Sequence, residues 1–242
     1  MQVDIGGWIG DGFKHLSNNW GKYVRPYLTF FGVLFAGGLL VGCMGGVGSI
    51  GVGFVAQNAG SAGGILSMLF GLFMMVLSLA FGAATAPLTL GFYKAVQAGL
   101  RGDEIRSDVI TGEFKNFVPA ALLLVIQMVG IFVGVLLCVI PGLLFGIGTS
   151  FAWCIMADRG GSPMDAIKGS IAMVQAQPGP IVGYFLAIGV MNFVIGLVPV
   201  VNLAWYLVFG VVAVTLQNVA YLRLSGSAGK MGDDGLLRNA GF

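Results

Sequence analysis

The chain has 242 residues, of which 57% are hydrophobic and only 9% are charged. An average soluble domain carries about 25% charged residues, so this composition excludes a fully water-exposed surface and predicts an integral membrane protein. The formal net charge of +2 is too small to indicate nucleic-acid binding.

Three blocks without a charged residue hold most of the apolar sequence. A bilayer core of about 30 Å requires about 20 apolar residues for one helical crossing. The blocks, residues 26–93, 116–157 and 169–222, are each long enough for two crossings. They predict an all-α polytopic membrane protein with six transmembrane helices in three hairpins, each preceded by an amphipathic helix on the cytoplasmic side.

The basic residues predict the orientation in the membrane. They fall in the N-terminal segment, in the connections 94–115 and 159–168, and in the C-terminal tail. These are alternate connections, and Lys and Arg favour the cytoplasmic side. We therefore expect both termini in the cytoplasm, with a flexible tail at 224–242. No cleavable signal peptide is expected, because the first 25 residues are amphipathic.

Residues 1–25 predict an amphipathic helix in the membrane interface. Apolar residues, including Trp8, Phe13 and Trp20, recur there at three- and four-residue spacing. Tryptophan favours the headgroup level of a bilayer, so these three side chains are expected at the interface. A helix that binds a protein partner is the alternative, because the same pattern serves both uses. His15 falls on the polar face and is expected to be solvated rather than to be a ligand.

Residues 26–93 predict the first hairpin, in which the glycine-rich run at 42–64 forms an outer loop. This run lacks the Gly-Lys-Ser/Thr motif of a phosphate-binding loop. Cys43 in this loop and Cys138 near the next outer turn would be able to pair, although small residues at helix contacts are the favoured interpretation. The cysteine spacing indicates no metal site, and we expect neither a metal nor a cofactor.

Residues 94–157 predict a second interfacial helix followed by the central hairpin. Phe114 and Phe117 share its apolar face and are expected in the membrane interface. Pro141 and Gly142 predict the turn of the hairpin, because proline ends a helix and glycine adopts turn conformations.

Residues 158–223 predict the third copy of this arrangement. Ser162 is expected to cap an interfacial helix that has Pro163 at its first position and Ile167 on its apolar face. Pro199 is expected at the turn of the last hairpin.

No ionisable side chain lies inside a predicted crossing, which argues against proton relays, ion-coupled transport and membrane catalysis. We expect no catalytic residue and no enzymatic activity. The deep polar groups are amides and hydroxyls, which are expected to make helix contacts; the amides would alternatively line a polar pore. The small-residue pairs Gly130/Gly134 and Gly142/Gly146 predict close helix packing. The amides are Gln127, Asn192, Gln217 and Asn218.

Three short motifs carry a resemblance to a known family. They are Ile140-Pro141-Gly142, Ser150-Phe151-Ala152, and Asp158 with the helix 162–170. They resemble uncharacterised six-helix bacterial membrane proteins related to the membrane domain found with some glycerophosphodiester phosphodiesterases. The resemblance implies the fold and the topology, and we expect the protein in the bacterial inner membrane. It does not imply the phosphodiesterase activity, because no hydrolase domain is attached.

The expected function is non-catalytic: a structural or scaffolding membrane protein that assembles with copies of itself or with a membrane-protein partner. Amphipathic helices inserted into one leaflet would also bias membrane curvature. Membrane lipids are expected partners, and nucleic acids are not. The alternative function is a passive channel or transporter for a small neutral or amphiphilic solute.

Overall fold

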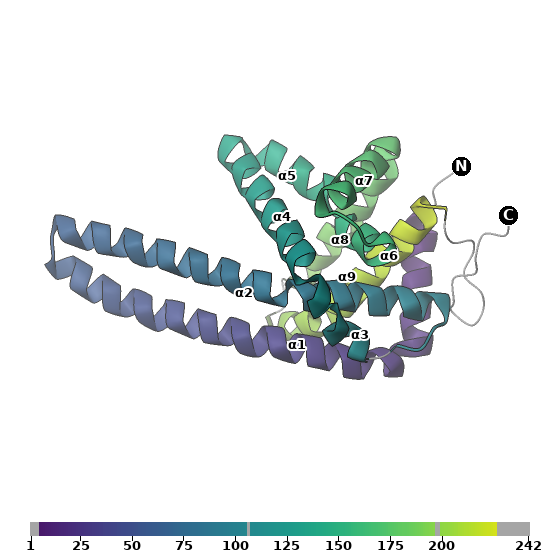
Figure 1. The fold of residues 1–242 in the computed structure, drawn as a ribbon, viewed down its shortest axis with the longest axis horizontal. Coiled ribbons are helices and arrows are strands. Elements are labelled where there is room, and N and C mark those ends of the chain that lie inside the picture. Colours follow the sequence, from purple (N-terminus) through teal and green to yellow (C-terminus); the bar gives the residue numbers. More distant parts are fainter. Residues whose placement is uncertain (1–4, 106, 197–198, 227–242) are drawn as a thin grey trace.

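The computed structural model describes residues 5–105, 107–196 and 199–226 (Figure 1). Every regular element in these residues is a helix, which confirms the all-α class. Apolar runs of this length leave backbone groups without water in a bilayer, and the helix pairs all of them within one segment.

The first helix, α1 (Ile5–Asn58), is continuous and about 80 Å long at 1.5 Å per residue. Pro26 lies inside it, so the boundary expected between residues 25 and 26 is not a break in the helix. Figure 1 shows instead that the first turns of α1 run across the direction of the remainder. Proline commonly introduces such a bend.

The glycine-rich outer loop predicted for residues 42–64 is wrong, because this run is helical. α1 continues to Asn58, the chain turns at Gly60, and α2 (Ser61–Arg101) begins directly afterwards. Gly60 has a φ of 56°, which glycine adopts readily. The helix prevails because unpaired backbone is more costly in lipid than the low helix propensity of glycine.

The long part of α1 and the first part of α2 form an antiparallel pair that projects from the rest of the protein, which we call the arm (residues 28–58 and 61–84; Figure 1). Its large apolar side chains point outward; Val47 and Ile50, for example, are 72% and 75% exposed. From Ala86 onward α2 enters the core.

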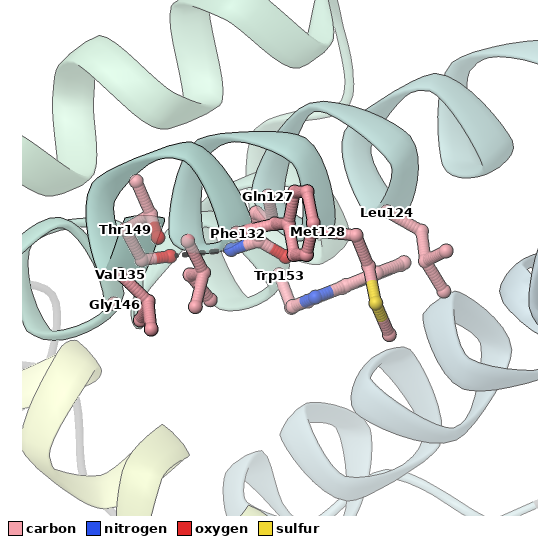
Figure 2. A pocket seen from close by; sticks show the side chains of 9 residues that line it. Leu124, Gln127, Met128, Phe132, Val135, Gly146, Thr149 and Trp153 are labelled. Carbon is pink, nitrogen blue, oxygen red and sulfur yellow. Dashed lines mark hydrogen bonds between the residues drawn. The ribbon is translucent and has the colours of Figure 1, made fainter. Parts of the chain in front are cut away.

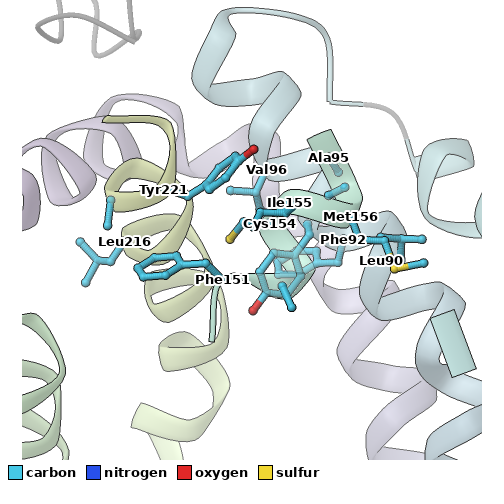
Figure 3. Close-up of a cluster of buried hydrophobic side chains, with 14 of the residues drawn as sticks. Leu90, Phe92, Ala95, Val96, Phe151, Cys154, Ile155, Met156, Leu216 and Tyr221 are labelled. Atoms are coloured by element: carbon cyan, nitrogen blue, oxygen red, sulfur yellow. The ribbon is translucent and has the colours of Figure 1, made fainter. Parts of the chain in front are cut away.

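The core of the protein lies beside the base of the arm. It is formed by the first turns of α1, the second half of α2, α6 (Ala152–Arg159) and the end of α9 (Pro199–Leu224). Figure 3 shows Phe92 from α2, Phe151 at the start of α6 and Tyr221 from α9 within one cluster. These apolar surfaces pack against protein rather than lipid.

The second hairpin follows the short helices α3 (Ser107–Gly112) and η1 (Glu113–Asn116). It consists of α4 (Phe117–Leu137) and α5 (Val139–Gly148), and the chain turns at Cys138. The turn predicted at Pro141 and Gly142 is therefore wrong by three residues.

Pro141 lies in the first turn of α5, where a missing backbone N–H costs no helical hydrogen bond. Gly142 contacts α4: a Cβ atom added to Gly134 would lie 2.6 Å from the Gly142 Cα atom. The predicted close packing of small residues is thus confirmed at this pair.

The third unit contains α7 (Pro163–Ala176) and α8 (Pro178–Gly196), which bend by 101° at the residue between them. Ser162 caps α7 as predicted, and its side chain accepts a hydrogen bond from the Met164 backbone N–H. Pro199 is the first residue of α9, whereas residues 197 and 198 lie outside the described part of the chain.

Four helical segments in the described residues are long and apolar enough to cross a membrane, and a fifth is formed if the bent pair α7–α8 counts as one span. The chain is therefore a membrane-embedded helical protein. The four segments are Pro26–Asn58, Ser61–Arg101, Asp108–Leu137 and Val139–Arg159.

Candidate functional site: a broken helix and its polar cluster

The segment Val139–Arg159 is a single apolar span that is interrupted at residues 149–151, between α5 and α6. We call these three residues the helix break. An interruption frees backbone N–H and C=O groups from the helical ladder, and each unpaired group costs several kcal/mol in hydrocarbon. The break is therefore stable only if other groups bind to it.

Three side chains from three other helices bind the backbone at the helix break. Ser170 of α7 donates to the Gly148 carbonyl at 2.6 Å and accepts from the Phe151 N–H at 3.0 Å. Gln127 of α4 donates to the Thr149 carbonyl at 2.8 Å. Gln217 of α9 donates to the Ser150 carbonyl. The break is thus the point at which α4, α7 and α9 are joined.

Further hydrogen bonds extend this cluster into α2. The Tyr93 hydroxyl donates to the Gln217 side-chain oxygen at 2.6 Å. Gln97 donates to the side-chain oxygen of Asn218 and to the Cys154 carbonyl, both at 2.9 Å. Gln97 and Asn218 are almost fully buried. In a membrane such amide contacts each contribute about 0.6 kcal/mol, and together they fix the register of the helices.

An ion pair closes the cluster at the end of α6. Arg101 lies 2.5 Å from one oxygen of Asp158, and the Tyr221 hydroxyl donates to the other at 2.8 Å. The Arg101 side chain is 40% exposed, so the pair lies at the edge of the protein. Exposed ion pairs contribute only about 0–1 kcal/mol to stability, so the main effect of this contact is to position the end of α6 against α2 and α9.

The structure brings three of the four predicted amides together. Gln127, Gln217 and Asn218 bind backbone or side chains of other helices around the break, which confirms that they make helix contacts. Asn192 is not part of this cluster; it donates to the Ile188 carbonyl of its own helix, α8. The polar pore stays a prediction.

The residues predicted in the membrane interface divide into two groups. Trp8 and Ile167 are buried in the core, only 6% and 4% exposed, so their placement against lipid is wrong. The first turns of α1 and the apolar face of α7 both pack against other helices. The other four are exposed, and their contact with lipid stays a prediction; they are Phe13, Trp20, Phe114 and Phe117.

His15 is buried rather than solvated. Its imidazole Nε2 atom lies 2.6 Å from the Tyr23 hydroxyl, and Asn19 donates to the His15 carbonyl. The prediction was wrong because the first part of α1 packs on two sides, against α2 at Gly99 and against α9 at Leu216. Burial raises the pKa of Tyr23, so its hydroxyl stays protonated.

Tyr93, Gln97 and Ser170 were not recognised as site residues in the sequence. Ser170 shares a face of α7 with Ala166 and Ile167, and all three are buried. The spacing of Ser170, three and four residues after the apolar Ile167 and Ala166, is the sequence feature that would have indicated its burial. Gln97 lies beyond Lys94, in the predicted connection 94–115, whereas Tyr93 is the last residue of the charge-free block 26–93.

Cysteines and acidic residues form no metal site in the described ranges. Cys43 and Cys138 are exposed and unpaired, and Cys154 is buried.

A groove of about 490 Å³ lies beside the helix break, between α4 and the α5–α6 segment (Figure 2). Its walls are apolar, and Gln127, Thr149 and Trp153 supply its polar atoms. The Trp153 ring stacks on Tyr93, with ring centroids 6.3 Å apart.

The chain is similar to uncharacterized proteins of Mycobacterium bovis and of two strains of Mycobacterium tuberculosis, with 48% identity over 56 residues. This match covers 23% of the chain and 17% of each relative, so the chain spans far less than the full length of the relatives it matches. No family model and no solved structure matches it. Nothing links the chain to glycerophosphodiester phosphodiesterases, and that resemblance stays a prediction.

Proposed function

We propose that the protein is a non-catalytic structural component of a bacterial inner membrane that assembles with copies of itself or with another membrane protein. The use of the deep amides supports this proposal most directly. The Gln127 and Gln217 amide groups donate hydrogen bonds to the helix break, and the Asn218 side-chain oxygen accepts one from Gln97, so all three residues link helices.

The arm supports the assembly part of the proposal. It presents many exposed apolar side chains and carries no charged residue from Pro26 to Tyr93. Helices of this kind associate in lipid through small residues that allow close approach. Gly38, Gly42 and Gly46 follow one another at four-residue spacing on α1, and an added Cβ atom at each would meet nothing within 4 Å.

The membrane-shaping part of the proposal rests on four exposed aromatic side chains, Phe13, Trp20, Phe114 and Phe117. Aromatic rings of this kind favour the headgroup level and would wedge one leaflet. We further propose six crossings in three hairpins, with both termini in the cytoplasm, because the basic residues lie in alternate connections.

Electron microscopy of the purified protein in native nanodiscs tests the assembly. We expect particles larger than one chain with a regular symmetry, and liposomes containing the protein should retain small neutral solutes. Monomeric particles would contradict the proposal. Solute flux that is lost in Asn192→Ala or Gln217→Ala would instead support the alternative, a passive channel.

A membrane-impermeant amine reagent, applied to intact cells, should leave Lys94 and Lys168 unmodified if the topology is as proposed.

A further inference from the structure

The groove beside the helix break contains two polar groups that have no partner in the described residues. The Gln127 amide donates to Thr149, but its side-chain oxygen accepts no hydrogen bond, and the Trp153 indole N–H donates none. Figure 2 shows both side chains at the same part of the groove. One is an acceptor and the other a donor.

These two atoms face a groove in which water would be scarce, because α4 and the α5–α6 segment are membrane-crossing by length and composition. An unpaired polar group in hydrocarbon costs several kcal/mol. A ligand that both donates and accepts would satisfy the Gln127 oxygen and the Trp153 N–H together. A hydroxyl group is the smallest group that does both.

The rest of the groove indicates the body of the ligand. Its other lining residues are almost all apolar, and none of the nine carries a charge. A phosphate headgroup would therefore have no cation to bind. The groove continues across α5, because a second hollow of about 350 Å³ shares Ile131, Val135 and Gly146 with it and reaches Phe185 of α8. An elongated apolar channel of this kind fits an acyl chain.

We propose that this groove binds a neutral membrane lipid with a free hydroxyl group, of the diacylglycerol class. The hydroxyl donates to the Gln127 oxygen and accepts from the Trp153 N–H, and one acyl chain lies along α4 and α5 toward Phe185. The site uses neither the arm nor the exposed aromatic residues of the proposed function, and it shares Gln127 and Thr149 with the polar cluster at the helix break.

Photolabelling tests the site in the full-length protein in phosphatidylcholine nanodiscs. The probe is a diacylglycerol with a diazirine in one acyl chain, and its matched control has the hydroxyl converted to a methyl ether. Mass spectrometry should find labels on groove residues such as Met128 and Phe132 with the hydroxyl lipid. The methyl ether should label them about fivefold less, which is the effect of one neutral hydrogen bond.

Trp153→Phe is the matching protein variant, because phenylalanine places a smaller aromatic ring at this position and has no N–H donor. We expect it to reduce groove labelling by the hydroxyl lipid about fivefold and to leave labelling of the arm unchanged. Trp20→Phe, outside the groove, should change neither. Equal labelling by the two lipids, or unchanged labelling of Trp153→Phe, would overturn the proposal. Equally strong labelling by a phosphatidic acid probe would overturn the neutral headgroup.

Discussion

Ser170 shows how one side chain stabilises an interruption in a transmembrane helix. It donates to the last carbonyl of α5 and accepts from the N–H that precedes α6, so it replaces two backbone hydrogen bonds that the break removes. It is fully buried, and no water reaches its partners. The helix break is therefore stabilised by a residue that lies 19 positions away from Phe151 in the sequence.

Ser170→Ala should destabilise the protein by about 1–3 kcal/mol, because it leaves the Gly148 carbonyl and the Phe151 N–H unpaired and buried. The expected result is a lower midpoint of thermal unfolding in detergent, measured by circular dichroism. Ser78→Ala is the matched control: Ser78 is exposed on the arm and donates only to the Met74 carbonyl of its own helix. Equal midpoints for the two variants would show that Ser170 does not support the break.

Close contact between two backbones sets the geometry of the second hairpin. A Cβ atom added to Gly134 would lie 2.6 Å from the Gly142 Cα atom and 2.7 Å from its nitrogen. No side chain separates α4 and α5 at this point, so neither residue can be enlarged without moving a helix. The turn at Cys138 lies four residues from each of these glycines.

Gly134→Ala should therefore destabilise the hairpin by about 1–3 kcal/mol, the usual cost of overpacking. Gly146→Ala is the control, because its added Cβ atom would make only an ordinary contact, 3.8 Å from Ile131. Both substitutions gain about 1 kcal/mol in helix propensity, so the difference between their unfolding free energies measures the steric clash at Gly134. Urea or thermal unfolding of the two variants in one detergent measures it. If Gly134→Ala is as stable as Gly146→Ala, the helices are further apart than described.

The whole molecule combines a core that binds its polar groups internally with an arm that has almost no protein neighbours beyond its own two helices. Figure 1 shows the arm extending away from the core in a different direction from the second hairpin. The longer helical segment of the arm, residues 28–58 of α1, measures about 46 Å at 1.5 Å per residue. This exceeds a hydrocarbon core of about 30 Å, so we expect the arm to tilt in the bilayer.

Spin labels should report the arm in lipid. In a variant without native cysteines, labels at Ile50→Cys and Met68→Cys should be accessible to oxygen, which dissolves in lipid, and shielded from a water-soluble nickel chelate. Both native side chains are well exposed, at 75% and 69%. A label at Gly102→Cys, in the exposed turn after α2, should show the opposite order. Chelate access at Ile50 and Met68 equal to that at Gly102 would place the arm in water.

The sequence was sufficient for the helical class because charge-free blocks of this length admit little else in a membrane. It was also sufficient for local signals, such as the Ser162 cap and the small-residue spacings that include Gly134 and Gly142. It failed where packing between distant segments decides the outcome. Trp8 and Ile167 have the periodicity of a lipid-facing surface, and His15 falls on the polar face of its helix, but all three are buried by other helices. The partners of Gln127 and Gln217 were equally hidden, because the helix break is not visible in an uninterrupted apolar run.

Neither helix of the arm carries a charged residue, and neither does the turn between them, so a transmembrane voltage exerts little force on the arm. Work done by a transmembrane voltage is proportional to the charge that moves, at about 2.3 kcal/mol per elementary charge for 100 mV. Residues 26–93 carry no formal charge to move. The depth of the arm in the bilayer should thus depend on the thickness of the bilayer and not on the membrane potential.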